Sequence, residues 1–100
     1  MAPVAVTQAM GAGANSPAAE AYIQAMQTMD DKTKNMSPSG DPSKDFVMMM
    51  MPHHQAAVDM AEAYLKYGKD PALRKLATDI VAAQEQEIAL MKAWLAANSK

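Results

Sequence analysis

The residues best suited to bind a ligand lie in one short stretch, FVMMMMPHHQ, at positions 46–55. Four methionines run without a break there, and two histidines follow after a proline. A methionine thioether is a neutral, polarisable ligand that suits Cu(I), and Ag(I) by the same reasoning, whereas imidazole binds more strongly and also accepts Cu(II). We therefore expect a soft-metal site here, with Cu(I) as the first choice and Cu(II) or Ag(I) as alternatives.

The spacing within this stretch places Met and His side chains on shared faces of a helix. Met49 and His53 are four residues apart, as are Met50 and His54. Side chains at this spacing are neighbours on a helix surface and can reach one ion. Pro52 has no N–H for the carbonyl four residues back, so we expect a local kink that frees a carbonyl. A tolerated kink without any purpose is the equal alternative.

A helical wheel of this segment divides the methionines between core and solvent. Met50 lies on the apolar stripe, with Met49 and His53 at its edge. Met48 and Met51 fall on the polar side and should face water. Methionine is also a flexible core filler, and a Met-rich stripe can be nothing more than core. Core packing explains Met50 but not the two outward methionines, and this favours the metal site.

The elements that must position these residues are three helices, each starting at a proline. In every case a Ser or Asp that can cap the helix precedes a proline at the first helical position, where its missing N–H is tolerated. The three starts are Ser16-Pro17, Asp41-Pro42 and Asp70-Pro71. We expect helices over about 17–35, 42–67 and 71–97. Their apolar stripes are Ala19, Tyr22, Ile23, Met26 and Met29 in the first, Phe46, Met50, Ala57, Ala61, Tyr64 and Leu65 in the second, and Leu73, Leu76, Ala77, Ile80, Ile88, Met91, Trp94 and Leu95 in the third.

Short connections make neighbouring helices antiparallel, so the predicted fold is an all-α, up-down helical bundle of ferritin-like type. Three helices of unequal length leave a groove, which dimerisation would complete. Counting back from each turn places further methionines of the first and third helices at the level of the Met-His stretch. The candidate metal ligands are therefore His53, His54, Met50, Met51, Met49, Met48, Met26, Met29, Met60 and Met91.

Two polar residues of the third helix fall on its apolar stripe at the level of the histidines. Gln84 and Glu87 each need a hydrogen-bond partner if they are buried there. Either residue could hold a histidine in the tautomer that a metal requires. The equal alternative is a buried polar pair that only fixes helix register.

Composition limits the other functions open to this chain. Its 100 residues suffice for one small domain, and we expect a flexible tail at 1–15 and a metal-binding helical domain at 16–100. The net charge of −2 and the lack of a basic block argue against nucleic acid as a partner. Apolar runs are too short to span a membrane. There are eleven methionines and no cysteine, so soft-metal binding would have to use thioethers and imidazoles.

The segments DFVMMMMPHHQAAVDMA and LRKLATDIVAAQEQEIALMKAW resemble the bacterial ferritin-like family of domains of unknown function, number 305, which includes the periplasmic copper-resistance protein CopM. The resemblance covers about residues 20–95, and its most specific parts are Met-x-Pro-His-His-Gln and Gln-x-x-Glu-Ile-x-x-Met-x-x-Trp. It implies a secreted or periplasmic helical bundle with a role in copper resistance or homeostasis, and a signal peptide already removed. The positions shared with the family are His53, His54, Met50 and Met91.

Three functions compete at this point. The first is a periplasmic or secreted protein that sequesters Cu(I) or hands it to copper-transfer proteins, with no catalysis. The second is a helical interaction module that uses exposed methionines as an adaptable contact surface. The third is a ferritin-like di-iron oxidase, which needs Glu-x-x-His motifs. Met50 and Met51 stand where those glutamates belong, so the oxidase is the weakest of the three.

Overall fold

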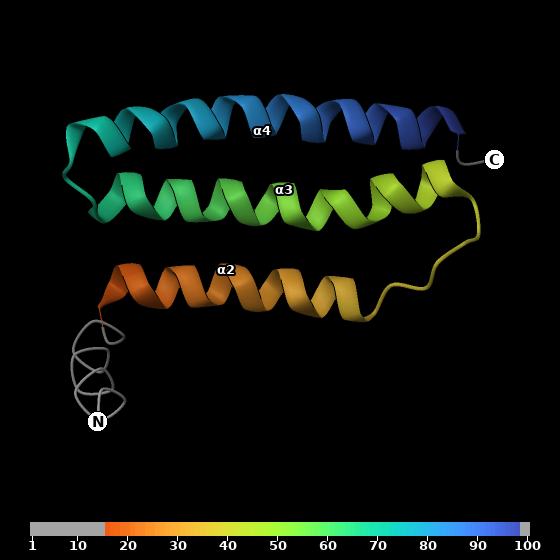
Figure 1. The fold of residues 1–100 in the computed structure, drawn as a ribbon, viewed down its shortest axis with the longest axis horizontal. Coiled ribbons are helices and arrows are strands. Elements are labelled where there is room, and N and C mark those ends of the chain that lie inside the picture. The colour runs from red at the N-terminus through yellow and green to blue at the C-terminus, as the bar shows by residue number, and fades with distance from the viewer. Residues whose placement is uncertain (1–15, 99–100) are drawn as a thin grey trace, which may run out of the picture.

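The computed structural model describes residues 16–98, and within that range the chain forms three α-helices and no strand (Figure 1). They are α2 (Pro17–Lys34), α3 (Pro42–Tyr67) and α4 (Pro71–Asn98). The predicted all-α, up-down antiparallel arrangement is confirmed, and the predicted helix bounds agree to within one residue. The tail expected at 1–15 lies outside the described residues.

The helices begin where their capping residues stand. The Ser16 hydroxyl oxygen accepts a hydrogen bond from the backbone N–H of Ala19 at 3.1 Å. The carboxylate of Asp70 accepts one from the N–H of Leu73 at 3.0 Å. Each cap satisfies a backbone donor that has no partner inside the helix, and the proline that follows has no donor to satisfy.

The three helices lie side by side in one layer. Helix α3 is in the middle and contacts both α2 and α4, whereas α2 and α4 make no contact with each other (Figure 1). The layer therefore has two broad open faces, one on each side of α3.

Helix α3 buries two opposite sides, one against each neighbour. Towards α4, Val47 and Val58 form a core cluster with Ile88 and Met91. The side towards α2 carries small buried residues, which lie about half a turn away around the helix. These residues are Pro52, Ala56 and Ala63, and the buried residue of α2 is Ala25.

The prediction that one apolar stripe of α3 is buried was wrong for Phe46, which is 63% exposed. Ala61 is buried, and the other predicted residues are partly buried: Met50, Ala57, Tyr64 and Leu65. On α2, Ile23 and Met26 are also exposed. The physical reason is the middle position of α3, because its core contacts lie on the two flanks and the predicted stripe lies on an open face between them. On α4, Ala77 and Ile88 are buried as expected, whereas the prediction was wrong for Leu73 and Leu76, which are exposed.

None of the helices between residues 16 and 98 is long and apolar enough to cross a lipid bilayer.

Candidate metal-binding site

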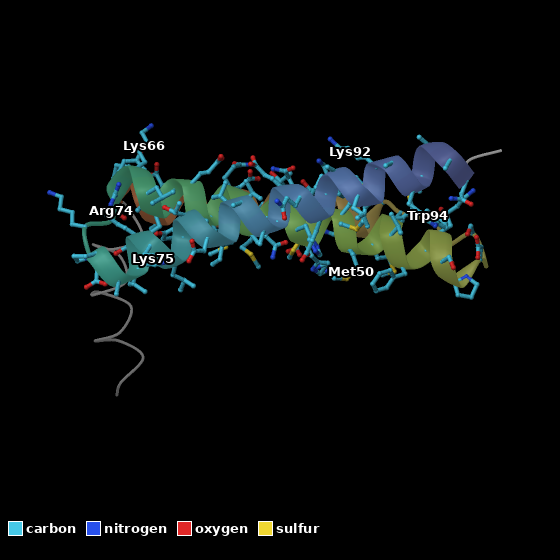
Figure 2. The ribbon with its side chains drawn as sticks, turned by 90° about the horizontal axis from the view of Figure 1, so that it is seen from above. Met50, Lys66, Arg74, Lys75, Lys92 and Trp94 are labelled. Atoms are coloured by element: carbon cyan, nitrogen blue, oxygen red, sulfur yellow. The ribbon has the colours of Figure 1, made fainter. Side chains whose placement is uncertain are left out.

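The structure divides the Met-His stretch between the two open faces of α3. One face contains a groove of about 670 Å³ that extends from α2 across α3 to α4. We call it the methionine groove, and its lining residues are Asp31, Lys32, Asn35, Met36, Met48, Met51, Pro52, Gln55, Ile88, Lys92 and Leu95. Figure 2 shows Lys92 on one side of the layer and Met50 on the other.

Three thioethers line the methionine groove. Met48 is 41% exposed, as the wheel predicts. Met51 lines the groove but is partly buried, because it also packs against the core cluster, so it faces water less than predicted. Its side chain leans towards α4, which passes on that flank. Met36 comes from the connection after α2, and sequence reasoning missed it because only methionines on predicted helices were aligned.

The groove is lined by both apolar and charged side chains. Pro52 lies in it beside Met48 and Met51, and it leaves the Met48 carbonyl without its usual helical donor. Lys32 and Lys92 stand among the lining residues, together with the carboxylate of Asp31, so cationic groups outnumber anionic ones there. A net positive charge repels a divalent ion about twice as strongly as a monovalent one. A groove of neutral sulfur donors with cationic neighbours therefore suits Cu(I) or Ag(I) better than Cu(II).

The opposite open face is apolar, and it carries the rest of the stretch. On α3 this apolar face consists of Phe46, Met50, His53, Ala57, Met60 and Tyr64, which are spaced alternately by three and four residues. Met49 and His53 are exposed, at the edge predicted for them. Met60 lines a hollow of about 350 Å³ together with Tyr22 and Tyr64. This face offers a Met49–His53 pair one turn apart.

His54 has a different environment from His53. Its Nδ1 lies 2.9 Å from the backbone carbonyl oxygen of Met50, and its Nε2 lies 2.5 Å from Glu87 Oε1. Both partners are acceptors, so a ring that makes both bonds donates from both nitrogens and has no lone pair for a metal. Glu87 is well exposed, so water can replace it. The bond to the Met50 carbonyl would then hold the tautomer that leaves Nε2 free for an ion.

The predicted partner of a histidine is therefore Glu87. Gln84 does not reach either histidine, and its amide oxygen is buried without a hydrogen-bond partner. Counting residues back from the turn placed His54 opposite residue 84, and the observed partner Glu87 lies three residues, or about one turn, further along α4.

The remaining predicted ligands are not gathered at one place. Met91 is 7% exposed in the core cluster, against which Met50 and Met51 pack. Met26 is exposed on α2, and Met29 is half-buried there. Within residues 16–98, no three side chains of His, Asp or Glu gather closely enough to hold a metal ion.

Comparison with known proteins gives two matches. The family model described as "Domain of unknown function (DUF305)" matches residues 41–100, which include α3 and α4. The uncharacterized protein L153 of Acanthamoeba polyphaga mimivirus is 38% identical over 52 residues. The aligned part is 52% of this chain and 34% of the viral protein, so the chain spans about a third of that relative.

Proposed function

We propose that this protein, which belongs to the DUF305 family, is a periplasmic or secreted carrier that sequesters or transfers Cu(I). The family description assigns no activity, so the proposal rests on this chain's own side chains. Methionine thioethers are the main ligands and imidazoles the auxiliary ones. Ag(I) is the alternative cargo, and no catalytic step is involved.

The methionine groove is the observation that carries this proposal. Met36, Met48 and Met51 come from two separate segments and line one hollow. Three neutral sulfur donors match the coordination that Cu(I) accepts, and they are poor ligands for hard ions. The partial exposure of Met48 leaves a route by which an ion can enter and leave. This route suits a protein that hands its cargo to another protein.

The histidines extend the same chemistry outside the groove. His53 with Met49 forms an exposed pair on the apolar face, where a second ion could bind. His54 becomes a ligand only when it releases Glu87. We therefore assign the stronger binding to the groove.

An anaerobic titration of the full chain with Cu(I), against a competing chelator of known affinity, tests the proposal. The unmodified chain should take copper from the chelator. A variant with Met48→Leu, Met51→Leu, His53→Gln and His54→Gln should lose most of this uptake, because these substitutions keep side-chain volume while removing the donor atoms. Circular dichroism checks that the variant still folds. No uptake by the unmodified chain, or equal uptake by the folded variant, refutes the copper function.

The interaction module remains the second candidate because several methionines are exposed. Met26 and Met49 are flexible apolar side chains at the surface. This alternative predicts that a protein partner stays bound after a copper chelator is added. Copper-dependent binding of the same partner would instead support the carrier.

A further inference from the structure

The apolar face has a pattern that nothing between residues 16 and 98 covers. On α3 its residues alternate at spacings of three and four, and α4 repeats this pattern on the same face. The α4 series is Leu73, Leu76, Ile80, Ala83, Glu87, Leu90 and Trp94. The two series lie side by side, since Met60 shares a hollow with Leu76 and Phe46 shares one with Trp94. Alternation of three and four is the spacing by which helices pack against other helices.

The exposure of this face is unusual for a folded chain. Leu90 is 72% exposed, Leu76 is 53% exposed, and Phe46 is exposed as well. No large side chain of the described residues is fully buried. Domains are normally built from at least two packed layers, and the three helices between residues 16 and 98 form one. A second layer is therefore needed to bury the apolar face.

We propose that two copies of this chain pack apolar face to apolar face, so that the second copy supplies the missing layer. Each copy would contribute α3 and α4 to a bundle related by a two-fold axis. The ionisable side chains among the two series are His53 and Glu87, and Glu87 is already bonded to His54. Nothing in this face therefore strongly repels an identical face.

The size of the face fits a dimer. Phe46, Leu73, Leu76 and Leu90 are each about half exposed or more. A large apolar side chain at that exposure contributes on the order of 100 Å². Together with the half-buried Met50, Met60, Ile80 and Trp94 they approach the roughly 800 Å² per partner of a standard stable interface. The proposal does not depend on copper, because the methionine groove lies on the other side of α3.

Light scattering coupled to size-exclusion chromatography tests the dimer on the full, metal-free chain. The expected mass is twice that of the 10.7 kDa chain. Leu76→Glu with Leu90→Glu should leave a folded monomer, because both side chains are exposed in the single chain. The dissociation constant should rise at least about 30-fold, since each substitution counts twice in a symmetric interface. Ala82→Glu with Ala89→Glu adds the same charges to exposed positions elsewhere around α4 and should leave the dimer intact.

The single tryptophan gives a second measurement. Trp94 lies on the apolar face next to Phe46, so dilution of the dimer should shift its fluorescence to the red. The Leu76→Glu and Leu90→Glu variant should have the red-shifted spectrum at all concentrations. The proposal is overturned if the unmodified chain is monomeric at about 100 µM protein, well above the micromolar dissociation constants of the weaker interfaces of this area. A double-Glu variant that stays as dimeric as the Ala-to-Glu control overturns it as well. Copper uptake by a monomeric chain would leave the carrier function standing.

Discussion

The two open faces of α3 contain neighbouring residues of one sequence run and yet differ in almost every physical respect. Met48 and Met51 line a groove together with Pro52, Asp31 and two lysines. Met50 lies on the side of the layer opposite Lys92 (Figure 2), and Met49 is exposed. Adjacent residues on a helix are separated by about 100°, so four successive methionines must enter different surroundings. A run of one residue type is therefore not one site.

Because of this difference, each face is suited to a different kind of partner. A groove with neutral sulfur donors and a surplus of ammonium groups over carboxylates is suited to a soft monovalent ion. A flat apolar face with helix-packing spacing is suited to another layer of helices. The following substitutions test this difference between the two faces, first in copper binding and then in stability.

The largest effect should come from removing the groove thioethers. A variant with Met36→Leu, Met48→Leu and Met51→Leu should bind Cu(I) at least about 100-fold more weakly, since loss of even supporting groups around a metal costs 10- to 100-fold. The matched control replaces Met26, Met49 and Met60 by Leu and should stay within about threefold of the unmodified chain, a span small beside that loss. Competition titration measures both. If the control loses the affinity and the groove variant keeps it, copper binds on the apolar face.

The next largest effect is on stability, and it distinguishes the buried Met91 from the exposed Leu90 beside it on α4. Met91→Ala should lower the free energy of unfolding by about 2–4 kcal/mol, because it leaves a cavity in the core cluster. Leu90→Ala should have almost no effect at protein concentrations where the chain is monomeric, and a growing effect as the concentration rises. Urea unfolding at several concentrations measures both. A large cost for Leu90→Ala in dilute solution would mean that the same chain already covers this face.

Met91→Leu separates packing from ligation at the same position. Leucine conserves the volume and removes the sulfur, so stability should change by less than about 1.5 kcal/mol. Copper affinity should also be unchanged, because the side chain is buried in the core cluster. A loss of copper binding in this variant would restore Met91 to the ligand set.

Local signals in the sequence predicted the helices, whereas the burial pattern needed the tertiary arrangement. Ser16, Asp41 and Asp70 mark helix starts through contacts with their own next few residues, so the sequence alone locates them. Whether Phe46 is buried depends on which sides of α3 its neighbours pass, and a wheel of one helix contains no such information. Met36 was missed for a related reason, since it lies in a connection whose path is set by the helices it joins.

A smaller effect is expected at the connection that carries Met36. Backbone and hydroxyl hydrogen bonds from Ser39, and a further N–H from Gly40, hold the pKa of Asp45 below its ordinary value. Gly40 has φ of 92°, which other residues rarely adopt, so the turn and its anchor depend on each other. Because the folded pKa is lowered, this stabilisation is present above the unfolded value of 3.8 and is lost as pH falls through the folded value.

Asp45→Asn should therefore lower the melting temperature slightly at pH 7, and the difference from the unmodified chain should vanish in acid, below the ordinary pKa of the Asp45 carboxyl. Asp79→Asn removes the same charge from an exposed pair with Lys75 and should change the melting temperature less. Thermal melts over a range of pH measure this. An Asp45 effect that persists unchanged at pH 2 would show that the anchor does not depend on the ionised carboxylate.

The smallest expected effect concerns pH: the copper affinity of the groove should depend on it very little. Thioethers bind no protons in water, and the ionisable side chains that line the groove are Asp31, Lys32 and Lys92, none of them an imidazole. Copper affinity of the unmodified chain should thus be nearly equal at pH 7.5 and pH 5.5, when compared by chelator competition. An ion held by imidazole should instead bind about tenfold more weakly at pH 5.5, because protons compete for free imidazole below about pH 6.5. If copper affinity falls tenfold at pH 5.5, and His53→Gln removes this pH dependence, the main copper site lies on the apolar face. A second copy of the chain would then compete with copper for that face.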